Sequence, residues 1–393
     1  MLEEQVWKKN LKIILFVRIC FSLLFAVSIM TLFWKKYGLD LFDIFLLQAI
    51  FAVSVVMFEV PTGYIADKLG RKKTLLLCCL IVSFGWIFYS RSTSFFEFTF
   101  SEVVLGIGFS LLSGTDSSLI YESLYELKEE ESFSKIEGRQ FGFHLWTGAI
   151  ASLIGGILAN FIKINFLILA SGIITLFAFF TCFLLTEPHR KPYFHPRGTL
   201  YGFYKIVRFV FLKSKIVKFV APLMAACSLS TMLGVWLYQS LWQEMSIPIW
   251  LFGVLWAAIL IPAGIASHYA DKLENIFGKK LIIYLMPLPA IIGYLLIAFI
   301  PGYSALIGIY LVSILRGLTN PILTKHIHKE TYSDKRATVL SLTNWLFRIS
   351  YFILGPLIGW IGKNYGLSLA FIGSAIISII SIAMFIPAVV KRI

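Results

Sequence analysis

Long apolar runs separated by short polar segments make up most of the chain. Runs of about 20 residues cross a hydrocarbon layer about 30 Å thick when they are helical, whereas barrel strands would alternate polar and apolar residues. The pattern therefore predicts an all-α polytopic membrane protein. Its twelve transmembrane helices are expected at about residues 11–34, 41–66, 74–91, 96–121, 139–161, 164–185, 217–240, 248–270, 280–300, 303–324, 338–361 and 367–389.

The long polar segment between the sixth and seventh runs predicts the domain organisation. It extends from Thr186 to about Ile216 and contains several prolines. We expect an N-terminal six-helix bundle at 1–186, a cytoplasmic linker at 187–216 and a C-terminal six-helix bundle at 217–393. Within the linker, apolar and basic residues alternate over 201–215, which suits a helix lying along the membrane surface.

Composition and charge agree with a membrane protein and predict its orientation. Of the 393 residues, 58% are hydrophobic and 14% are charged, against about 25% charged in soluble proteins. The net charge of +14 does not indicate nucleic-acid binding, because the basic residues lie at the edges of the apolar runs. A cytoplasmic N-terminus places 27 of the 35 Lys and Arg residues inside and five outside, so both termini are expected in the cytoplasm.

A short basic segment between the second and third runs carries a recognisable motif. Gly63 and Asp67 precede Gly70, Arg71 and Lys72 in the sequence GYIADKLGRKK. Part of this sequence recurs about 200 residues later. The segment ADKL at 66–69 reappears at 270–273 and is followed by GKK at 278–280. A repeat at half the chain length, in the same membrane context, predicts two related halves.

The motif resembles the loop 2–3 signature of the major facilitator superfamily, a family of secondary transporters. The resemblance implies two pseudo-symmetric six-helix bundles, a central cavity and alternating access. It also implies that Gly63, Asp67, Gly70, Arg71 and Lys72 gate the cytoplasmic side, with Asp67 contacting the eleventh span in the outward-open state. We expect a multi-pass protein of a bacterial inner membrane that acts as a monomer.

Ionisable residues inside spans cost about 2.5–3.5 kcal/mol each on insertion scales, so they are candidate functional residues. The six are Arg18, Glu59, Glu102, Asp116, Arg316 and Arg348. The acids Glu102, Asp116 and Glu59 are candidates for a coupling proton, because burial raises the pKa of a carboxyl group. Glu102 and Asp116 are expected on one face of a continuous helix. The alternative is that Arg18 neutralises a carboxylate and serves the structure rather than transport.

The two arginines of the C-terminal half are candidates for substrate binding. Arg316 and Asn320 lie one helical turn apart, as do Arg348 and Asn344. Guanidinium and carboxamide groups together suit a carboxylate, a phosphate or a carbonyl-rich ligand. Arg18 is a further candidate. The alternative is that these arginines pair with acids or backbone carbonyls and serve the structure.

Other residues carry weaker signals. The five cysteines lie in apolar runs without metal-ligand spacing, and no phosphate loop, nucleophile elbow or zinc motif is present. No enzyme activity, cofactor or metal is therefore expected. The prediction is a transporter of a small organic solute, with efflux coupled to protons as the leading hypothesis. Transport of an anionic metabolite or carboxylate siderophore, and a transporter-like sensor, are the alternatives.

Overall fold

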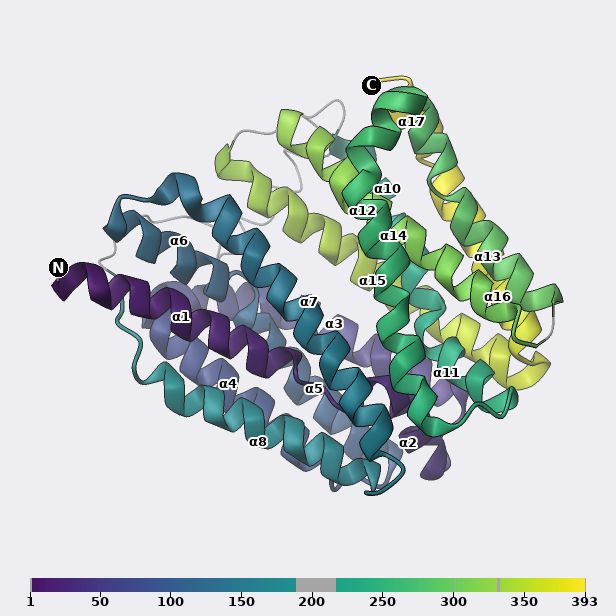
Figure 1. Cartoon of the computed structure of the whole chain (residues 1–393), viewed down its shortest axis with the longest axis horizontal. Helices are drawn as coiled ribbons and strands as arrows, with labels where there is room; N and C mark the ends of the chain where they lie inside the picture. The colour runs from purple at the N-terminus through teal and green to yellow at the C-terminus, as the bar shows by residue number, and fades with distance from the viewer. Residues whose placement is uncertain (1, 189–216, 301, 331–332, 393) are drawn as a thin grey trace. The chain divides into compact units, whose positions relative to one another are not determined.

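The computed structural model describes residues 2–188, 217–300, 302–330 and 333–392, and every regular element among them is helical. In chain order (Figure 1) these are α1 (Leu2–Ser22), η1 (Val27–Ile29), α2 (Met30–Lys36), α3 (Leu41–Leu69), α4 (Arg71–Tyr89), α5 (Phe95–Leu112), α6 (Thr115–Leu127), η2 (Glu130–Ser132), α7 (Phe133–Leu158), α8 (Ile164–Cys182), α10 (Val217–Leu233), α11 (Val235–Glu244), α12 (Ile249–Leu285), α13 (Leu288–Phe299), α14 (Ala305–Glu330), α15 (Ser333–Tyr365), α16 (Leu367–Ala383) and α17 (Ile386–Val390).

The helices agree with the predicted all-α membrane protein. Eleven helical segments within the described residues are long and apolar enough to cross a membrane, and α13 is a shorter apolar helix. The eighth and ninth predicted spans meet inside α12, where Gly278 has φ 78° and interrupts the helical backbone. The remainder of α12 followed by α13 forms the ninth span, so the count of twelve is consistent with the structure.

Five predicted spans, the first, fourth, seventh, ninth and twelfth, are not continuous helices, and the break in the fourth bears on the candidate acids. The fourth span divides between α5 and α6, because Ser113 leaves the helical conformation and Gly114 has φ 77°. Glu102 therefore lies in α5, whereas Asp116 lies in the first turn of α6. The expectation that these two acids share a face of one helix is wrong, since it assumed an unbroken backbone between them.

The described part of the chain forms two compact units, which we treat separately. The first comprises Met1–Phe33, Val53–Phe203 and Ile249–Val254, and the second comprises Trp34–Ala52, Tyr204–Pro248 and Leu255–Ile393. Each unit includes a short segment from the other half of the sequence. The predicted boundaries at 186 and 217 stay a prediction, and nearly all of the predicted linker, including its surface helix at 201–215, lies outside the described residues.

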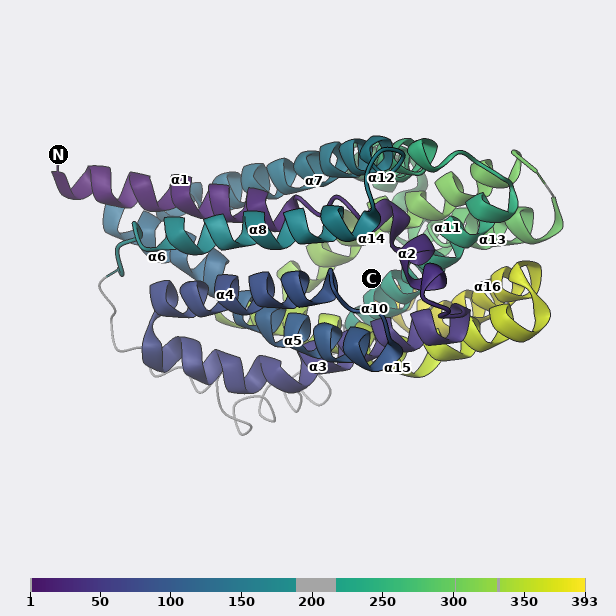
Figure 2. The same ribbon diagram turned by 90° about the horizontal axis from the view of Figure 1, so that it is seen from below.

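Glycines bring the helices of the first unit close together. Figure 2 shows α4 between α8 and α5, with which it packs most extensively. A Cβ atom at Gly108 of α5 would lie 2.3 Å from a methyl group of Val82, and one at Gly172 of α8 would lie 2.8 Å from Ile87. At both crossings the glycine therefore leaves room for a side chain of α4, which lets the helices approach closely.

The second unit has a similar crossing between α13 and α14. A Cβ atom at Gly293 would lie 2.4 Å from the carbonyl oxygen of Gly308, and one at Gly308 would lie 2.5 Å from that of Gly293. The two helices thus meet backbone to backbone. This contact holds α14, which carries Arg316, against the rest of the unit.

Candidate functional site

A cluster of charges lies in the first unit around Arg18 of α1. The Arg18 Nε donates to Asp116 of α6 at 2.8 Å, and its two terminal nitrogens donate to the Glu137 carboxylate at 3.0 and 2.9 Å. Ser117 donates to Glu137 at 2.7 Å, and its backbone N–H donates to Asp116 at 2.8 Å. One guanidinium is therefore shared by two carboxylates, and the ionised cluster carries a net charge of −1.

Glu137 was missed by the sequence analysis, which placed residues before 139 in a polar loop. In the structure α7 begins at Phe133, so that Glu137 lies in its second turn and faces α1. The missed signal was the helical spacing of the apolar residues Phe133 and Ile136 within the charged segment, on the side of the buried Gln140. The predicted span begins at 139 and leaves this segment outside the membrane, although one face of it is covered.

A histidine adjoins this cluster. The Ser22 hydroxyl donates to the carbonyl oxygen of Arg18 at 2.6 Å and is also hydrogen bonded to Nδ1 of His144. A further titratable group therefore lies beside the Arg18 cluster.

The other two candidate acids lie apart from that cluster. Glu102 is 4% exposed and accepts a hydrogen bond from the Tyr89 hydroxyl at 3.0 Å. The rings of Phe33 and Phe98 pack against Tyr89. Glu59 lies in α3 and accepts from the Ser113 hydroxyl at 3.4 Å.

The motif between α3 and α4 is held by acids from outside it. Asp67 pairs with Arg71 at 3.3 Å, and Arg71 also donates to Glu122 of α6 at 3.2 Å. Glu187 accepts the backbone N–H groups of Arg71 and Lys72 at 2.7 and 2.8 Å. A carboxylate at this position stabilises the N-terminus of α4 through the unpaired amides and the helix dipole.

Gly70 is required at this turn for two reasons. Its φ of 107° is unfavourable for residues with a side chain, and a Cβ atom there would lie 2.7 Å from a Glu187 oxygen. Gly278 in the second unit has a similar conformation, with φ 78° and ψ 155° against 107° and 157° for Gly70. The sequence repeat therefore corresponds to a repeated backbone turn, even though the second copy has extra residues before its glycine.

In the second copy of the motif the aspartate also pairs with a cation, but that cation belongs to another helix. Lys325 of α14 donates to Asp271 at 3.1 Å and to Glu274 at 2.9 Å. Asp271 is part of the repeated ADKL sequence, whereas Glu274 is 3% exposed and was not a candidate. Both copies thus place their aspartate beside a cation.

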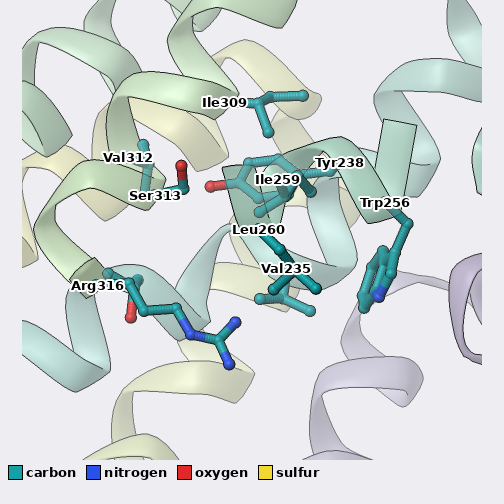
Figure 3. Close-up of a pocket in the computed structure, with 10 residues that line it drawn as sticks. Val235, Tyr238, Trp256, Ile259, Leu260, Ile309, Val312, Ser313 and Arg316 are labelled. Carbon is teal, nitrogen blue, oxygen red and sulfur yellow. The ribbon is translucent and has the colours of Figure 1, made fainter. Parts of the chain in front are cut away.

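Arg316 lies near the middle of α14 and lines a cavity of the second unit. Thr231, Val235, Tyr238, Trp256, Ile259, Leu260, Ile309, Val312 and Ser313 form the rest of its lining. Figure 3 shows the Arg316 guanidinium extending into this cavity, with the Trp256 ring on the opposite side. The Arg316 side chain is exposed, and it makes no ion pair or hydrogen bond with any residue that the structure describes. An uncompensated cation thus faces a mainly apolar cavity.

The other predicted binding residues are arranged differently. Asn320 is exposed one turn after Arg316 on α14, as its spacing predicted, but it is not part of the cavity lining. Arg348 of α15 lies over the Phe51 ring, with 5.8 Å between the guanidinium carbon and the ring centroid, and Asn344 is exposed one turn before it. Arg18 is engaged by the two acids described above. Among the predicted substrate-binding residues, Arg316 is therefore the one that lines this cavity.

An all-helical fold with many membrane spans, charged clusters within them and an apolar cavity lined by the Arg316 guanidinium indicates a polytopic membrane transporter. The model of the Major Facilitator Superfamily matches residues 13–354. The chain belongs to the major facilitator superfamily, and it is a transporter rather than an enzyme. No curated protein sequence matches the chain significantly.

Solved structures with the same fold are also transporters. A mutant of the nucleoside transporter NupG superposes with a TM-score of 0.81 at 12% identity, covering 97% of this chain and 99% of that one. A bacterial homologue of the human lysosomal transporter Spinster, inward-facing and unoccupied, gives 0.77 at 13% identity, covering 98% and 97%. Identities this low establish the fold and leave the substrate open.

Proposed function

We propose that this protein is a proton-coupled secondary transporter of small amphipathic organic anions, working by alternating access. The observation that carries the proposal is Arg316, whose guanidinium lines a mainly apolar cavity without a partner among the described residues. A charge in mid-membrane costs about 2.5–3.5 kcal/mol on insertion scales. A bound anion would offset that cost, and the apolar lining would favour an amphipathic one.

The Arg18 cluster supports the proposed coupling to protons. Asp116 and Glu137 share a single guanidinium, so one added proton would neutralise the cluster. We assign Asp116 as the coupling residue together with Glu137, and we retain Glu102 and Glu59 as further candidates. Glu102 is the more buried of those two, and its neutral form would avoid the cost of desolvating a charge.

The remaining parts of the proposal concern the membrane. We assign the protein to a bacterial inner membrane as a monomer, with both termini in the cytoplasm, because the loops assigned to that side hold most of the Lys and Arg residues. Gly63, Asp67, Gly70, Arg71 and Lys72 would form the cytoplasmic gate. Arg348, Asn344 and Asn320 would complete the substrate path in the C-terminal half.

Transport by the purified full-length chain in liposomes tests the proposal. With an imposed pH gradient, labelled benzoate should accumulate faster than in protein-free liposomes, whereas the uptake of tetraphenylphosphonium and uridine should equal that of protein-free liposomes. Arg316→Gln should abolish benzoate accumulation and Arg316→Lys should reduce it, because lysine keeps the charge but loses the planar guanidinium fork. Arg91→Gln, which removes an exposed guanidinium in the loop before α5, is the matched control and should transport normally.

A second candidate function is export of uncharged or cationic amphipathic compounds. Five aliphatic side chains of the cavity favour it, namely Val235, Ile259, Leu260, Ile309 and Val312. One of the structural neighbours is a nucleoside transporter, which also supports this candidate. If tetraphenylphosphonium or uridine is transported and benzoate is not, this second function replaces the first.

A further inference from the structure

The polar groups of the Arg316 cavity determine which part of a ligand it can bind. The Ser313 hydroxyl donates to the carbonyl oxygen of Tyr310 at 2.7 Å, and the Thr231 hydroxyl donates to that of Ser228 at 3.0 Å. Their hydrogens are therefore used within their own helices. Among the described lining residues, Arg316 is the only one with a formal charge, so the cavity matches one negative charge and not a dianion.

One wall of the same cavity is aromatic and is supported from behind. Trp256 lines the cavity and lies 6.5 Å from Trp236, centroid to centroid, and Trp236 lies 5.1 Å from Trp34 in an edge-to-face arrangement. Trp34 is 1% exposed and Trp236 is 7% exposed, whereas Trp256 is half-buried. The two buried rings hold the third in position while part of it remains available to a ligand.

A second ring of the wall is held in a similar way. Tyr238 is 3% exposed, and its ring stacks on Phe371 with centroids 6.2 Å apart and planes at 12°. The aromatic surface is therefore positioned before any ligand binds, which reduces the entropy lost on binding. Flat ligand rings pack on such surfaces by offset or edge-to-face stacking.

From these contacts we infer that the Arg316 cavity binds monoanions with a flat aromatic ring, of the aryl carboxylate or aryl sulfonate class. The anionic group pairs with Arg316, and the ring packs against Trp256 on the opposite side of the cavity (Figure 3). This inference rests on the proposed transport of organic anions, and it adds that the apolar part of the ligand is a flat aromatic ring. A saturated ring of the same size and charge lacks the flat face and binds less well.

Benzoate and cyclohexanecarboxylate form a matched pair for testing it, since both are ionised at pH 7 and both have a six-membered ring. Their affinities for the purified full-length protein are measured by titration calorimetry, with benzyl alcohol as the uncharged analogue. Stacking predicts that benzoate binds about 2- to 12-fold more tightly than cyclohexanecarboxylate. Benzyl alcohol should bind more weakly than either anion.

Two variants separate the ring from the charge. Trp256→Leu should remove the preference for benzoate while both anions still bind, and Trp250→Leu, an exposed tryptophan on the same helix outside the cavity lining, should keep the preference. Arg316→Gln should weaken binding of both anions at least tenfold. Thermal unfolding of each variant identifies any that fails to fold, and Trp256→Phe then replaces Trp256→Leu, with the benzoate preference expected to persist.

The outcomes distinguish this inference from the proposed function. Equal binding of the two anions, both dependent on Arg316, overturns the aromatic preference and leaves the transport of organic anions standing. A preference for benzoate that survives Trp256→Leu also overturns the inference. If neither anion binds, or if benzyl alcohol binds as tightly as benzoate, both proposals fail.

Discussion

At the scale of single residues, the charges within the spans are stabilised in different ways. Arg18 is shared by two carboxylates, whereas Arg348 lies over an aromatic ring. Arg316 has neither kind of partner among the described residues and lines a cavity. Three arginines that all lie within predicted spans therefore have different surroundings. The groups that the fold brings near each arginine determine its role.

Removing the Arg18 guanidinium should destabilise the protein more than removing either acid. Arg18→Ala leaves Asp116 and Glu137 close together without a cation. Loss of one partner of a fully buried pair costs about 3–5 kcal/mol, and this part-buried cluster should lose less than that. Asp116→Asn leaves the Arg18–Glu137 pair and should cost less. Thermal unfolding in detergent, followed by tryptophan fluorescence, measures both changes. A melting temperature for Arg18→Ala equal to that of the wild type would contradict the role assigned to the cluster.

Gly70→Ala should destabilise the turn before α4. The substitution places a methyl group 2.7 Å from a Glu187 oxygen at a φ of 107°, so the carboxylate would have to leave the helix N-terminus. Loss of such a cap costs about 0.5–2 kcal/mol, and the strained backbone adds to it. Gly63→Ala is the control, because nothing lies within 4 Å of its Cβ position. Equal melting temperatures for the two variants would disprove the prediction.

At the scale of elements, glycines determine both where helices break and where they cross. Gly114 and Gly278 have positive φ values and interrupt predicted or apparent continuous helices. Gly293 and Gly308 instead lie within helices and allow α13 and α14 to touch. The two kinds of glycine look alike in the sequence, since each lies in or beside an apolar run.

Gly308→Ala should therefore destabilise the second unit although alanine favours helices. Its Cβ atom would lie 2.5 Å from the carbonyl oxygen of Gly293, and overpacking of this kind costs about 1–3 kcal/mol. Gly264→Ala in α12 is the matched control, because its Cβ position is open and alanine gains about 0.5–1 kcal/mol of helix propensity. Unfolding in detergent compares the two variants. If Gly308→Ala is as stable as Gly264→Ala, the close crossing is not required.

At the scale of the whole molecule, the two related halves carry two copies of one turn. Each has a glycine with positive φ and a preceding aspartate beside a cation, which is Arg71 in one copy and Lys325 in the other. The cations come from different places, since Arg71 follows its own turn and Lys325 belongs to α14. The two copies thus share the backbone turn but differ in the cation that pairs with the aspartate.

Asp67→Asn should slow transport at equal expression. The change keeps the shape of the side chain and removes the charge that pairs with Arg71 at 3.3 Å, and it leaves the Arg71–Glu122 pair intact. If Asp67 is part of the cytoplasmic gate, interconversion of the two states should be impaired while equilibrium binding of substrate is kept. Uptake into liposomes and binding by calorimetry measure the two properties. Unchanged uptake would show that the loop has only a topological role.

The sequence by itself determined the class of protein, the helical fold and most span positions. Long apolar runs indicate segments that lie in lipid. Few backbone conformations are stable in a bilayer, so the local sequence pattern is enough to predict these features. It also identified the motif residues and the six charges within spans. These inferences used composition, spacing, the internal repeat and the resemblance of the motif to the loop 2–3 signature of the major facilitator superfamily.

Only the tertiary structure decided which charges meet and which do not. Glu137, Glu187 and Glu274 were missed because their partners are distant in the sequence or their segment was interpreted as a loop. The break between α5 and α6 depends on backbone angles at two residues, and apolar spacing does not report these. Arg316 became distinct from Arg18 only when the acids beside Arg18 and the apolar cavity around Arg316 were in view. Charge pairing is a property of position in space, and an apolar sequence pattern determines that a helix is buried without determining what it faces.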